Sequence, residues 1–148
     1  MKITPTKLLA TIALLAATVM ATAKELDITA DDSMKFNLAE LHTDAGQETT
    51  IIFTNLGKLP KAAMGHNFVL LKPGTDLAAF GNAAVAAAAN EYIPTQPELA
   101  SQVVAHTKVL GPGEKDSIRI TLAEPGSYPY ICSFPGHWAL MKGVLVVK

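Results

Sequence analysis

The sequence predicts an all-β fold: a Greek-key β-sandwich of seven to eight strands, with a helical insertion around residues 75–102. Three observations favour this fold class. Short runs of β-branched and aromatic residues are separated by turn residues, one late run alternates between apolar and polar residues, and no segment is repeated. Many short strands without internal repeats are typical of a sandwich.

The N-terminal half supplies four of the expected strands. Glu25–Thr29 and Met34–Asn37 mix polar and apolar residues and are separated by a polar turn. Thr49–Thr54 is rich in β-branched residues, which favour the pleated conformation. Asn67–Leu71 is a further strand, and Lys72-Pro73-Gly74 ends it.

Three more strands are expected near the C-terminus. Asp116–Leu122 alternates isoleucine and leucine with polar residues, which indicates one buried and one exposed face. Ser127–Cys132 follows a Glu-Pro-Gly turn, and Val144–Val147 lies at the end of the chain.

One alanine-rich stretch, residues 76–90, interrupts the β pattern and predicts helix. Thr75 is the expected N-cap, and Gly81 weakens the middle, so two short helices are an alternative to one. Pro97–Gln102 could add another turn, with proline at its first position. Because the alanines and Val85 favour burial, we expect the insertion to pack against the outside of the sandwich.

The first 23 residues have the pattern of a secretory signal peptide. A basic start is followed by the apolar run Leu8–Met20 and by Ala21-Thr22-Ala23, a small-residue cleavage site. We expect cleavage after Ala23, export to the periplasm, and a single mature domain, residues 24–148.

Charge and hydropathy exclude two classes of partner. Residues 24–148 carry 10 basic and 13 acidic side chains, so no excess of positive charge is available for nucleic acid. No segment after the signal peptide reaches the roughly 18 apolar residues that a membrane span requires.

The most informative motif begins at Cys132, the only cysteine in the chain. An odd cysteine in an exported protein indicates either intermolecular pairing or a thiol kept for its chemistry. His137 follows five residues later and Met141 four residues after that, with Pro135-Gly136 bending the loop between them. Thiolate, imidazole and thioether form the donor set of a blue-copper site once a second imidazole joins them.

Three histidines could supply that second imidazole: His42, His66 and His106. His66 lies at the start of a predicted strand, where its side chain would reach the end of the sandwich. His42 lies just before the polar turn at residues 43–46 and is expected at the surface, and His106 has the pattern of an exposed strand position. Position therefore favours His66.

Five blocks, in this order, resemble the azurins, bacterial blue-copper proteins of the cupredoxin family. They are Met64-Gly65-His66-Asn67, Val104-Ala105-His106-Thr107-Lys108, Gly113-Glu114-Lys115-Asp116-Ser117, Cys132-Ser133-Phe134-Pro135-Gly136-His137 and Ala139-Leu140-Met141-Lys142-Gly143. The resemblance covers nearly all of residues 24–148, and the Cys-x₄-His-x₃-Met spacing is that of azurins. It implies a cupredoxin-like sandwich.

The resemblance also implies one type 1 copper ion per chain. Its ligands would be His66, Cys132 and His137, with Met141 as the weak axial ligand and the Gly65 carbonyl as a distant fifth contact. By the same resemblance, Asn67 and the Phe134 amide are hydrogen-bond partners near the Cys132 sulfur.

The sequence departs from the azurin pattern at three places. Azurins usually join their N-terminal strand to a nearby loop by a disulfide, and this chain has no cysteine for it. The turn Thr54–Lys58 lacks the buried histidine that azurins often carry there. Phe68 stands where many azurins have a buried tryptophan. None of these departures touches the expected ligands.

The expected function is that of a soluble periplasmic carrier of single electrons that cycles between Cu(II) and Cu(I). An alternative is an exported protein that buffers or delivers copper. A cysteine hydrolase or transferase would need a third group to orient His137, and the loop offers none, so we expect no enzymatic activity.

The expected partners are redox proteins such as c-type cytochromes or periplasmic reductases. The protein is expected to bind them as a monomer. The residues around the ligands are uncharged, and such apolar patches often mark interaction sites. We expect a docking surface formed by Met64, Pro135, Gly136 and Trp138. Trp138 is the strongest candidate because tryptophan is enriched at interface hot spots.

Overall fold

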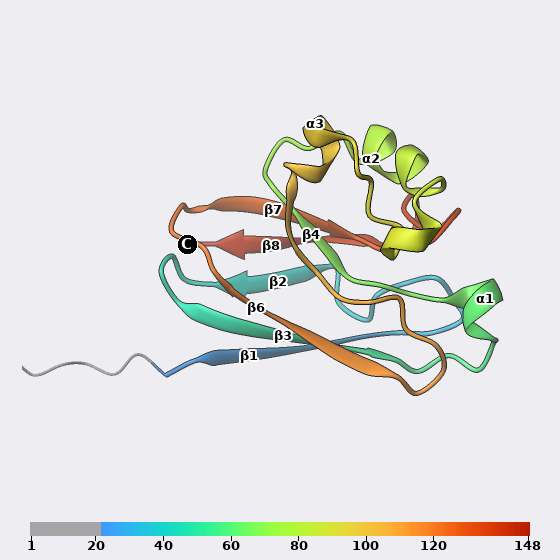
Figure 1. Ribbon diagram of the computed structural model, residues 1–148. Helices are drawn as coiled ribbons and strands as arrows, with labels where there is room; N and C mark the ends of the chain where they lie inside the picture. Colours follow the sequence, from blue (N-terminus) through green and yellow to red (C-terminus); the bar gives the residue numbers. More distant parts are fainter. Residues whose placement is uncertain (1–21) are drawn as a thin grey trace, which may run out of the picture.

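The computed structural model describes residues 22–148, which form two sheets stacked face to face (Figure 1). The three-stranded sheet has the order β1-β3-β6, and the five-stranded sheet has the order β2-β8-β7-β4-β5. The first sheet consists of β1 (Lys24–Ala30), β3 (Glu48–Asn55) and β6 (Lys115–Thr121). The second consists of β2 (Glu40–Thr43), β8 (Lys142–Val147), β7 (Gly126–Ile131), β4 (Val69–Leu71) and β5 (Val103–His106).

The chain crosses between the two sheets several times. It passes from β1 to β2 in the other sheet and returns to β3, which pairs with β1 in parallel. β2 likewise pairs in parallel with β8, the last strand. The remaining pairs in both sheets are antiparallel. This topology confirms the expected cupredoxin-like sandwich and brings β4 and β7 side by side, which positions the metal centre described below.

An aromatic cluster lies at the centre of the core between the sheets. The Phe36 ring meets those of Phe53, Phe68 and Tyr130 edge-to-face at centroid distances of 5.7, 5.8 and 5.2 Å. The Phe68 and Tyr130 rings stack at 4.8 Å. Such geometries add to the stabilisation from buried area alone. Phe68, one of the departures from the azurin pattern, is therefore an integral part of this core.

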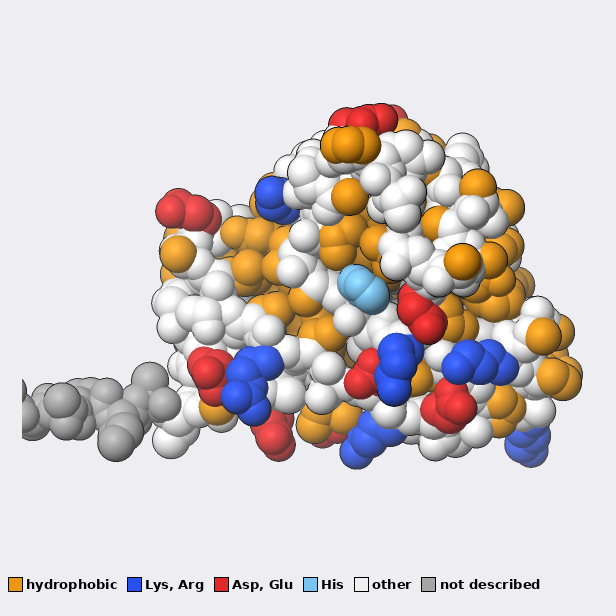
Figure 2. All heavy atoms as spheres, viewed as in Figure 1, with side chains coloured by type: hydrophobic (Ala, Val, Ile, Leu, Met, Phe, Trp, Pro, Cys, Tyr) orange, Lys and Arg blue, Asp and Glu red, His pale blue; other side chains and the backbone are white. Residues whose placement is uncertain are grey.

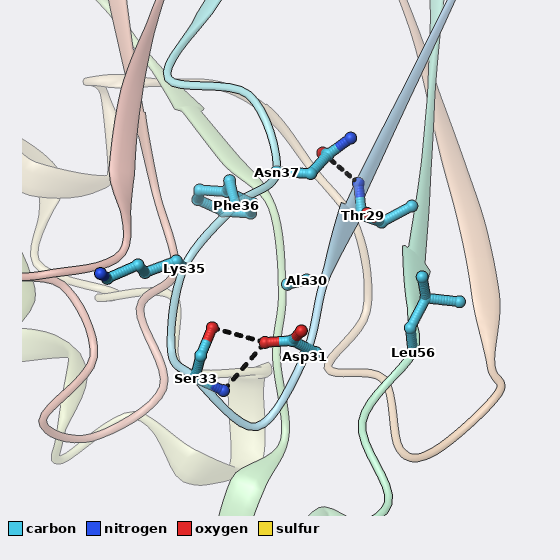
Figure 3. Close-up of a pocket in the computed structure, with 8 residues that line it drawn as sticks. All are labelled: Thr29, Ala30, Asp31, Ser33, Lys35, Phe36, Asn37 and Leu56. Atoms are coloured by element: carbon cyan, nitrogen blue, oxygen red, sulfur yellow. Dashed lines mark hydrogen bonds between the residues drawn. The ribbon is translucent and has the colours of Figure 1, made fainter.

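The expected strand Met34–Asn37 is not formed, which corrects the sequence analysis. Met34 has a left-handed φ of 55°, and only Phe36 makes an isolated bridge, to Ala30. The Asp31 carboxylate accepts hydrogen bonds from Ser33, and the Asn37 side chain accepts one from the Thr29 N–H, beside a shallow hollow (Figure 3). These side-chain bonds to the backbone compete with a strand ladder.

Two strands, β2 and β5, were not among those listed from the sequence. Both have only four residues: β2 alternates between exposed and buried side chains, whereas β5 shows no alternation. β4 is also shorter than expected, because it begins at Val69 rather than at Asn67. Short strands carry too few residues for a period of two to stand out.

The insertion contains α2 (Leu77–Ala84), the 3₁₀ helix η1 (Ala88–Asn90) and α3 (Pro97–Ala100). Asp76, not Thr75, is the N-cap of α2, because its carboxylate accepts hydrogen bonds from the Ala78 and Ala79 amides. The helix continues through Gly81. Val85, expected to be buried, is 52% exposed. Pro97 lies in the first turn of α3, as predicted.

The insertion covers the outer face of the five-stranded sheet (Figure 1), as expected. Phe80 of α2 and Ile93 pack against Val69, Leu71 and Ile131. The intervening residues of β4 and β7 point the other way, into the central core, because side chains alternate along a strand. β4 and the end of β7 that precedes Cys132 are therefore buried on both faces.

Charged side chains of both signs are interspersed over the lower half of the face in Figure 2, above β3 and β6. The upper half, where the insertion lies above β4 and β7, shows fewer charged side chains. Within residues 22–148, no helix is long and apolar enough to cross a lipid bilayer. Residues 1–21 of the expected signal peptide lie outside the described part of the chain, so cleavage after Ala23 stays a prediction.

Candidate metal centre

Three side chains from separate segments converge at one end of the sandwich. His66 lies between α1 (Lys61–Met64) and β4, Cys132 directly follows β7, and His137 lies in the loop that leads to β8. The Cys132 Sγ is 3.9 Å from the His66 Nδ1 and 3.6 Å from the His137 Nδ1, and the two nitrogens are 3.2 Å apart. His66 and Cys132 are fully buried, and His137 is 3% exposed.

Backbone hydrogen bonds close the loop that carries Cys132 and His137. The His137 amide donates to the Phe134 carbonyl at 3.0 Å, and the Met141 amide donates to the His137 carbonyl at 2.8 Å. The Cys132 amide donates to the Met141 carbonyl at 3.0 Å, which joins the two ends of the loop. Gly136 has a φ of 81°, a left-handed conformation that glycine adopts without strain. The predicted Pro-Gly bend is therefore present.

The orientation of His66 is fixed from the side opposite the cysteine. Its Nε2 lies 3.0 Å from the Asp31 carbonyl oxygen, so Nε2 carries the proton and Nδ1 keeps a free lone pair. The His66 backbone exchanges two hydrogen bonds with Leu110, at 3.1 and 2.7 Å. Such outer contacts hold a metal-binding imidazole in one tautomer and one orientation.

Asn67 connects the two ligand segments. Its Oδ1 accepts a hydrogen bond from the Ser133 amide at 2.8 Å, and its Nδ2 donates to the Ser133 Oγ at 2.9 Å. Asn67 and Ser133 directly follow the ligands His66 and Cys132, and both are fully buried. The pair therefore fixes the distance between the two ligands.

Burial shifts the pKa of all three side chains. It raises the pKa of the Cys132 thiol to about 12, although the backbone N–H groups of Asn67 and Phe134 oppose the shift by donating to the sulfur. Burial and the neighbouring His66 lower the pKa of His137 to about 4, and burial also lowers the pKa of His66. Both imidazoles are therefore neutral near pH 7 and able to bind a metal.

These donors fit copper. A triangle with edges of 3.2, 3.6 and 3.9 Å holds a small ion about 2.1 Å from each corner, close to the bond lengths of first-row metals to nitrogen and sulfur. One sulfur and two imidazole nitrogens are the trigonal donors of blue-copper sites. A bound cation would also compensate the cost of ionising a buried thiol.

Comparison with known proteins agrees with this geometry. The family model for copper binding proteins of the plastocyanin/azurin family matches residues 22–148. The chain belongs to this family. Azurin from Achromobacter denitrificans is 40% identical over 131 residues, which cover 86% of each chain. Azurin from Alcaligenes faecalis is 41% identical over 127 residues, which cover 83% of this chain and 97% of the relative.

A solved structure extends the agreement to the fold. Auracyanin A, described as a blue copper protein from Chloroflexus aurantiacus, superimposes with a TM-score of 0.77 at 32% identity. The match covers 86% of this chain and all of auracyanin A. Family membership and the cluster of His66, Cys132 and His137 together identify copper as the cofactor.

The other residues expected from the azurin resemblance lie around this cluster. Met141 is fully buried, and the Phe134 ring lies tilted against the His137 ring with centroids 4.9 Å apart. Gly65 is wedged between neighbours: a Cβ there would lie 2.6 Å from the Val109 Cγ1 and 2.7 Å from the Lys61 carbonyl oxygen. A side chain at this position would displace the azurin-like ligand loop. The axial role of Met141 and the fifth contact at Gly65 remain proposals.

The expected docking residues differ in exposure. Gly136 is exposed, whereas Met64, Pro135 and Trp138 are half-buried. The Trp138 ring packs against Gly81 of α2, where a Cβ would lie 2.2 Å from the indole Cγ. Trp138 therefore also anchors the insertion to the ligand loop, a contact that the sequence did not indicate.

The two remaining histidines are both exposed, as the sequence indicated. His42 is exposed on β2, where its Nε2 is 2.9 Å from a Glu40 carboxylate oxygen. His106 is exposed at the end of β5, with its Nδ1 beside the Thr107 carbonyl. Neither belongs to the copper-site cluster.

Sequence reasoning missed the partners that act through the backbone. The Asp31 carbonyl, which orients His66, has no side-chain signature, and its segment was expected to be a turn. In the sequence, Ser133 has no signal beyond its place in the azurin-like motif. Glu91 and Tyr92, which contact the site from the insertion, were not recognised at all, because no local pattern links them to the ligands.

Proposed function

We propose that this chain is a one-electron carrier exported to the periplasm. The observation that carries the proposal is the buried, preorganised triangle of His66, Cys132 and His137. Donors that already face one another leave little to rearrange when an ion between them gains or loses an electron. The signal-peptide pattern of residues 1–23 supports export.

His66, Cys132 and His137 would hold the copper, with Met141 as the axial ligand and the Gly65 carbonyl as a distant contact. The bound ion supplies a one-electron couple between Cu(II) and Cu(I). The chain supplies the rest: Asp31 and Asn67 hold the ligands in place, and the backbone N–H groups of Asn67 and Phe134 donate to the sulfur. The complete burial of Cys132 excludes water.

Electrons would enter and leave beside His137. Met64, Pro135, Gly136 and Trp138 form the proposed docking surface, and Leu140, 62% exposed, extends its apolar character. Exported redox proteins such as c-type cytochromes or periplasmic reductases fit such a surface, and the carrier would meet them as a monomer. Because the surface residues are uncharged, the rate of transfer should depend weakly on ionic strength.

Burial of the donors also argues against the alternative roles. A protein that delivers copper must release it to an acceptor, and three donors with at most 3% exposure favour retention. A cysteine enzyme would need a substrate at the thiol, and the Cys132 side chain is fully covered. We therefore propose no catalytic activity.

A reductive titration of the copper-loaded protein tests the proposal. One electron equivalent per chain should bleach the visible absorption, and an oxidised c-type cytochrome should restore it without loss of copper. Met64→Lys should slow this transfer and leave the spectrum unchanged. Copper release to an acceptor protein, with no reversible bleaching, would instead identify a delivery protein.

A further inference from the structure

A turn with unusual backbone geometry joins the helical insertion to the metal centre. Glu91 and Tyr92, just after η1, have φ values of 54° and 58°, a left-handed conformation that non-glycine residues rarely adopt. The turn is tightly held: the Tyr92 amide donates to the Ala87 carbonyl, and the side chain of Asn90 donates to the Ile93 carbonyl. Non-glycine residues in this conformation often mark functional positions.

Glu91 makes two hydrogen bonds that reach the metal centre. Its carboxylate accepts from the Val109 amide at 2.6 Å. Its backbone carbonyl accepts from the Asn67 Nδ2 at 2.9 Å, the same amide group that donates to Ser133. Glu91 therefore completes the hydrogen bonding of the Asn67 side chain, which fixes the distance between His66 and Cys132.

The Val109 contact acts on His66 from the other side. Val109 is 4% exposed, packs against Gly65 and precedes Leu110, whose backbone pairs with that of His66. The Glu91 carboxylate therefore holds the segment Val109-Leu110 in place, and the backbone of His66 is hydrogen-bonded to this segment. Loss of the acceptor would leave a buried N–H group without a partner, which is costly.

Tyr92 reaches the second ligand segment. Its ring meets the Phe134 ring edge-to-face at a centroid distance of 5.1 Å, and Phe134 in turn lies 4.9 Å from the His137 ring. Because the Phe134 amide donates to the Cys132 sulfur, a shift of Phe134 would change that bond. The two residues of the turn therefore contact the surroundings of all three ligands.

We propose that Glu91 and Tyr92 are positioning residues that set the reduction potential of the copper. They keep the Asn67 and Phe134 amides directed at the Cys132 sulfur and close the site to water. Hydrogen bonds to the sulfur and a dry surrounding both favour the reduced ion, so loosening the turn lowers the potential. This inference rests on the proposed ligand set.

Two neutral variants isolate the role of the Glu91 carboxylate. Glu91→Gln removes the charge but keeps an oxygen that can accept from the Val109 amide, whereas Glu91→Ala removes the acceptor as well. Both keep a Cβ, so the left-handed backbone is equally disfavoured in each. We expect a lower midpoint potential in Glu91→Ala than in Glu91→Gln by voltammetry, with copper bound at one ion per chain in both.

Hydrogen exchange in the metal-free proteins supplies a readout independent of copper. The Leu110 and Val109 amides should exchange faster in Glu91→Ala than in the parent, and near the parent rate in Glu91→Gln. Glu124→Ala and Glu124→Gln form a matched control pair. Glu124 lies in the turn before β7, at the opposite end of this strand from Cys132. Their potentials should agree with each other.

Tyr92 gives a second, independent comparison. Tyr92→Phe keeps the ring on Phe134 and should retain the parent potential, whereas Tyr92→Leu should lower it. Equal potentials within both pairs, in proteins that remain blue, would overturn the inference and leave the proposed function intact. A parent protein that binds copper without becoming blue would instead contradict the proposed ligand set.

Discussion

At the residue scale, the side chains between the ligands matter as much as the ligands. Asn67 bonds to Ser133 on one side and to Glu91 on the other, and Gly65 allows Val109 to approach the ligand loop closely. Both residues influence where the ligands lie through contacts that do not involve the ion. Substitutions at these two positions therefore test the geometry of the site directly.

Asn67→Leu should destabilise the protein and lower its reduction potential. The change leaves the buried Ser133 amide without an acceptor, which costs about 1–3 kcal/mol. Urea unfolding of the metal-free protein measures the loss. Asn37→Leu is the control, because it removes an exposed side-chain acceptor from the Thr29 amide and should cost less. Equal stabilities of Asn67→Leu and the parent would contradict the proposal that Asn67 fixes the distance between His66 and Cys132.

Gly65→Ala should weaken copper binding although the fold is retained. Gly65 has a φ of −66°, which alanine adopts freely, so the contacts of the added Cβ alone decide the outcome. The Cβ would lie 2.7 Å from the backbone oxygen of Lys61, and this oxygen cannot move without α1. Competition with a copper chelator measures the affinity.

The control is Gly111→Ala, whose Cβ would meet the Lys61 Cβ at a milder 3.1 Å. It should retain most of the affinity. If Gly65→Ala bound copper as tightly as the parent, the close packing of the ligand loop would have no role in holding the ion.

At the element scale, strands with a clear alternating pattern could be predicted from the sequence. Segments whose conformation depends on contacts with other parts of the chain could not. β3 and β6 alternate between buried and exposed residues over seven or eight positions, and both were found within one or two residues of their bounds. Met34–Asn37 mixes polar and apolar residues, but hydrogen bonds from the Ser33 and Thr29 amides to the Asp31 and Asn37 side chains favour a turn. That competition is decided by tertiary contacts, which composition does not show.

The same distinction applies to the metal centre. The spacing of Cys132, His137 and Met141 lies within one loop and could be read directly from the sequence. His66 was favoured only by its position before a strand, and the turn at Glu91 and Tyr92 carried no signal at all. Contacts made through backbone carbonyls and amides, such as that of Asp31, depend on the folded chain rather than on residue type.

Gly81→Ala provides a test of the contact between α2 and the ligand loop. Alanine favours a helix over glycine by about 1 kcal/mol, so an isolated helix would gain stability. Here the Cβ would lie 2.2 Å from the Trp138 ring, and overpacking of this kind costs about 1–3 kcal/mol. We expect net destabilisation in thermal melts.

Two further variants separate packing from helix propensity. Asn82→Ala, exposed on the same helix, should be neutral or slightly stabilising. Gly81→Ala combined with Trp138→Leu should recover part of the loss, because the smaller side chain leaves room for the Cβ. A Gly81→Ala protein more stable than the parent would show that Trp138 moves away at little cost.

At the scale of the whole molecule, most of the core consists of residues other than the proposed ligands, although Cys132 and Met141 belong to it. The aromatic cluster around Phe36 and the packing of the insertion use none of the ligand side chains. We therefore expect the metal-free protein to keep its strand content by circular dichroism and to melt cooperatively. Copper should raise the melting temperature, because it binds the folded chain preferentially. Loss of strand signal on copper removal would contradict this expectation.

The buried imidazole of His137 should make the metal-free protein less stable in acid. Burial lowers its pKa from 6.5 to about 4, so below pH 6.5 the unfolded chain binds more protons than the folded one. This contribution is fully present above pH 6.5 and is lost as pH falls toward 4, by about 3 kcal/mol at most. Urea midpoints across this range measure it, and His137→Gln should flatten the profile.

The central claim is that Cys132, His66 and His137 bind one copper ion through the cysteine sulfur. Addition of Cu(II) to the metal-free protein, followed by visible absorption, tests it most directly. We predict a strong thiolate-to-copper charge-transfer band that saturates at one ion per chain and is absent from Cys132→Ser. A parent protein that stays colourless at full copper occupancy, or a Cys132→Ser variant as blue as the parent, would contradict it.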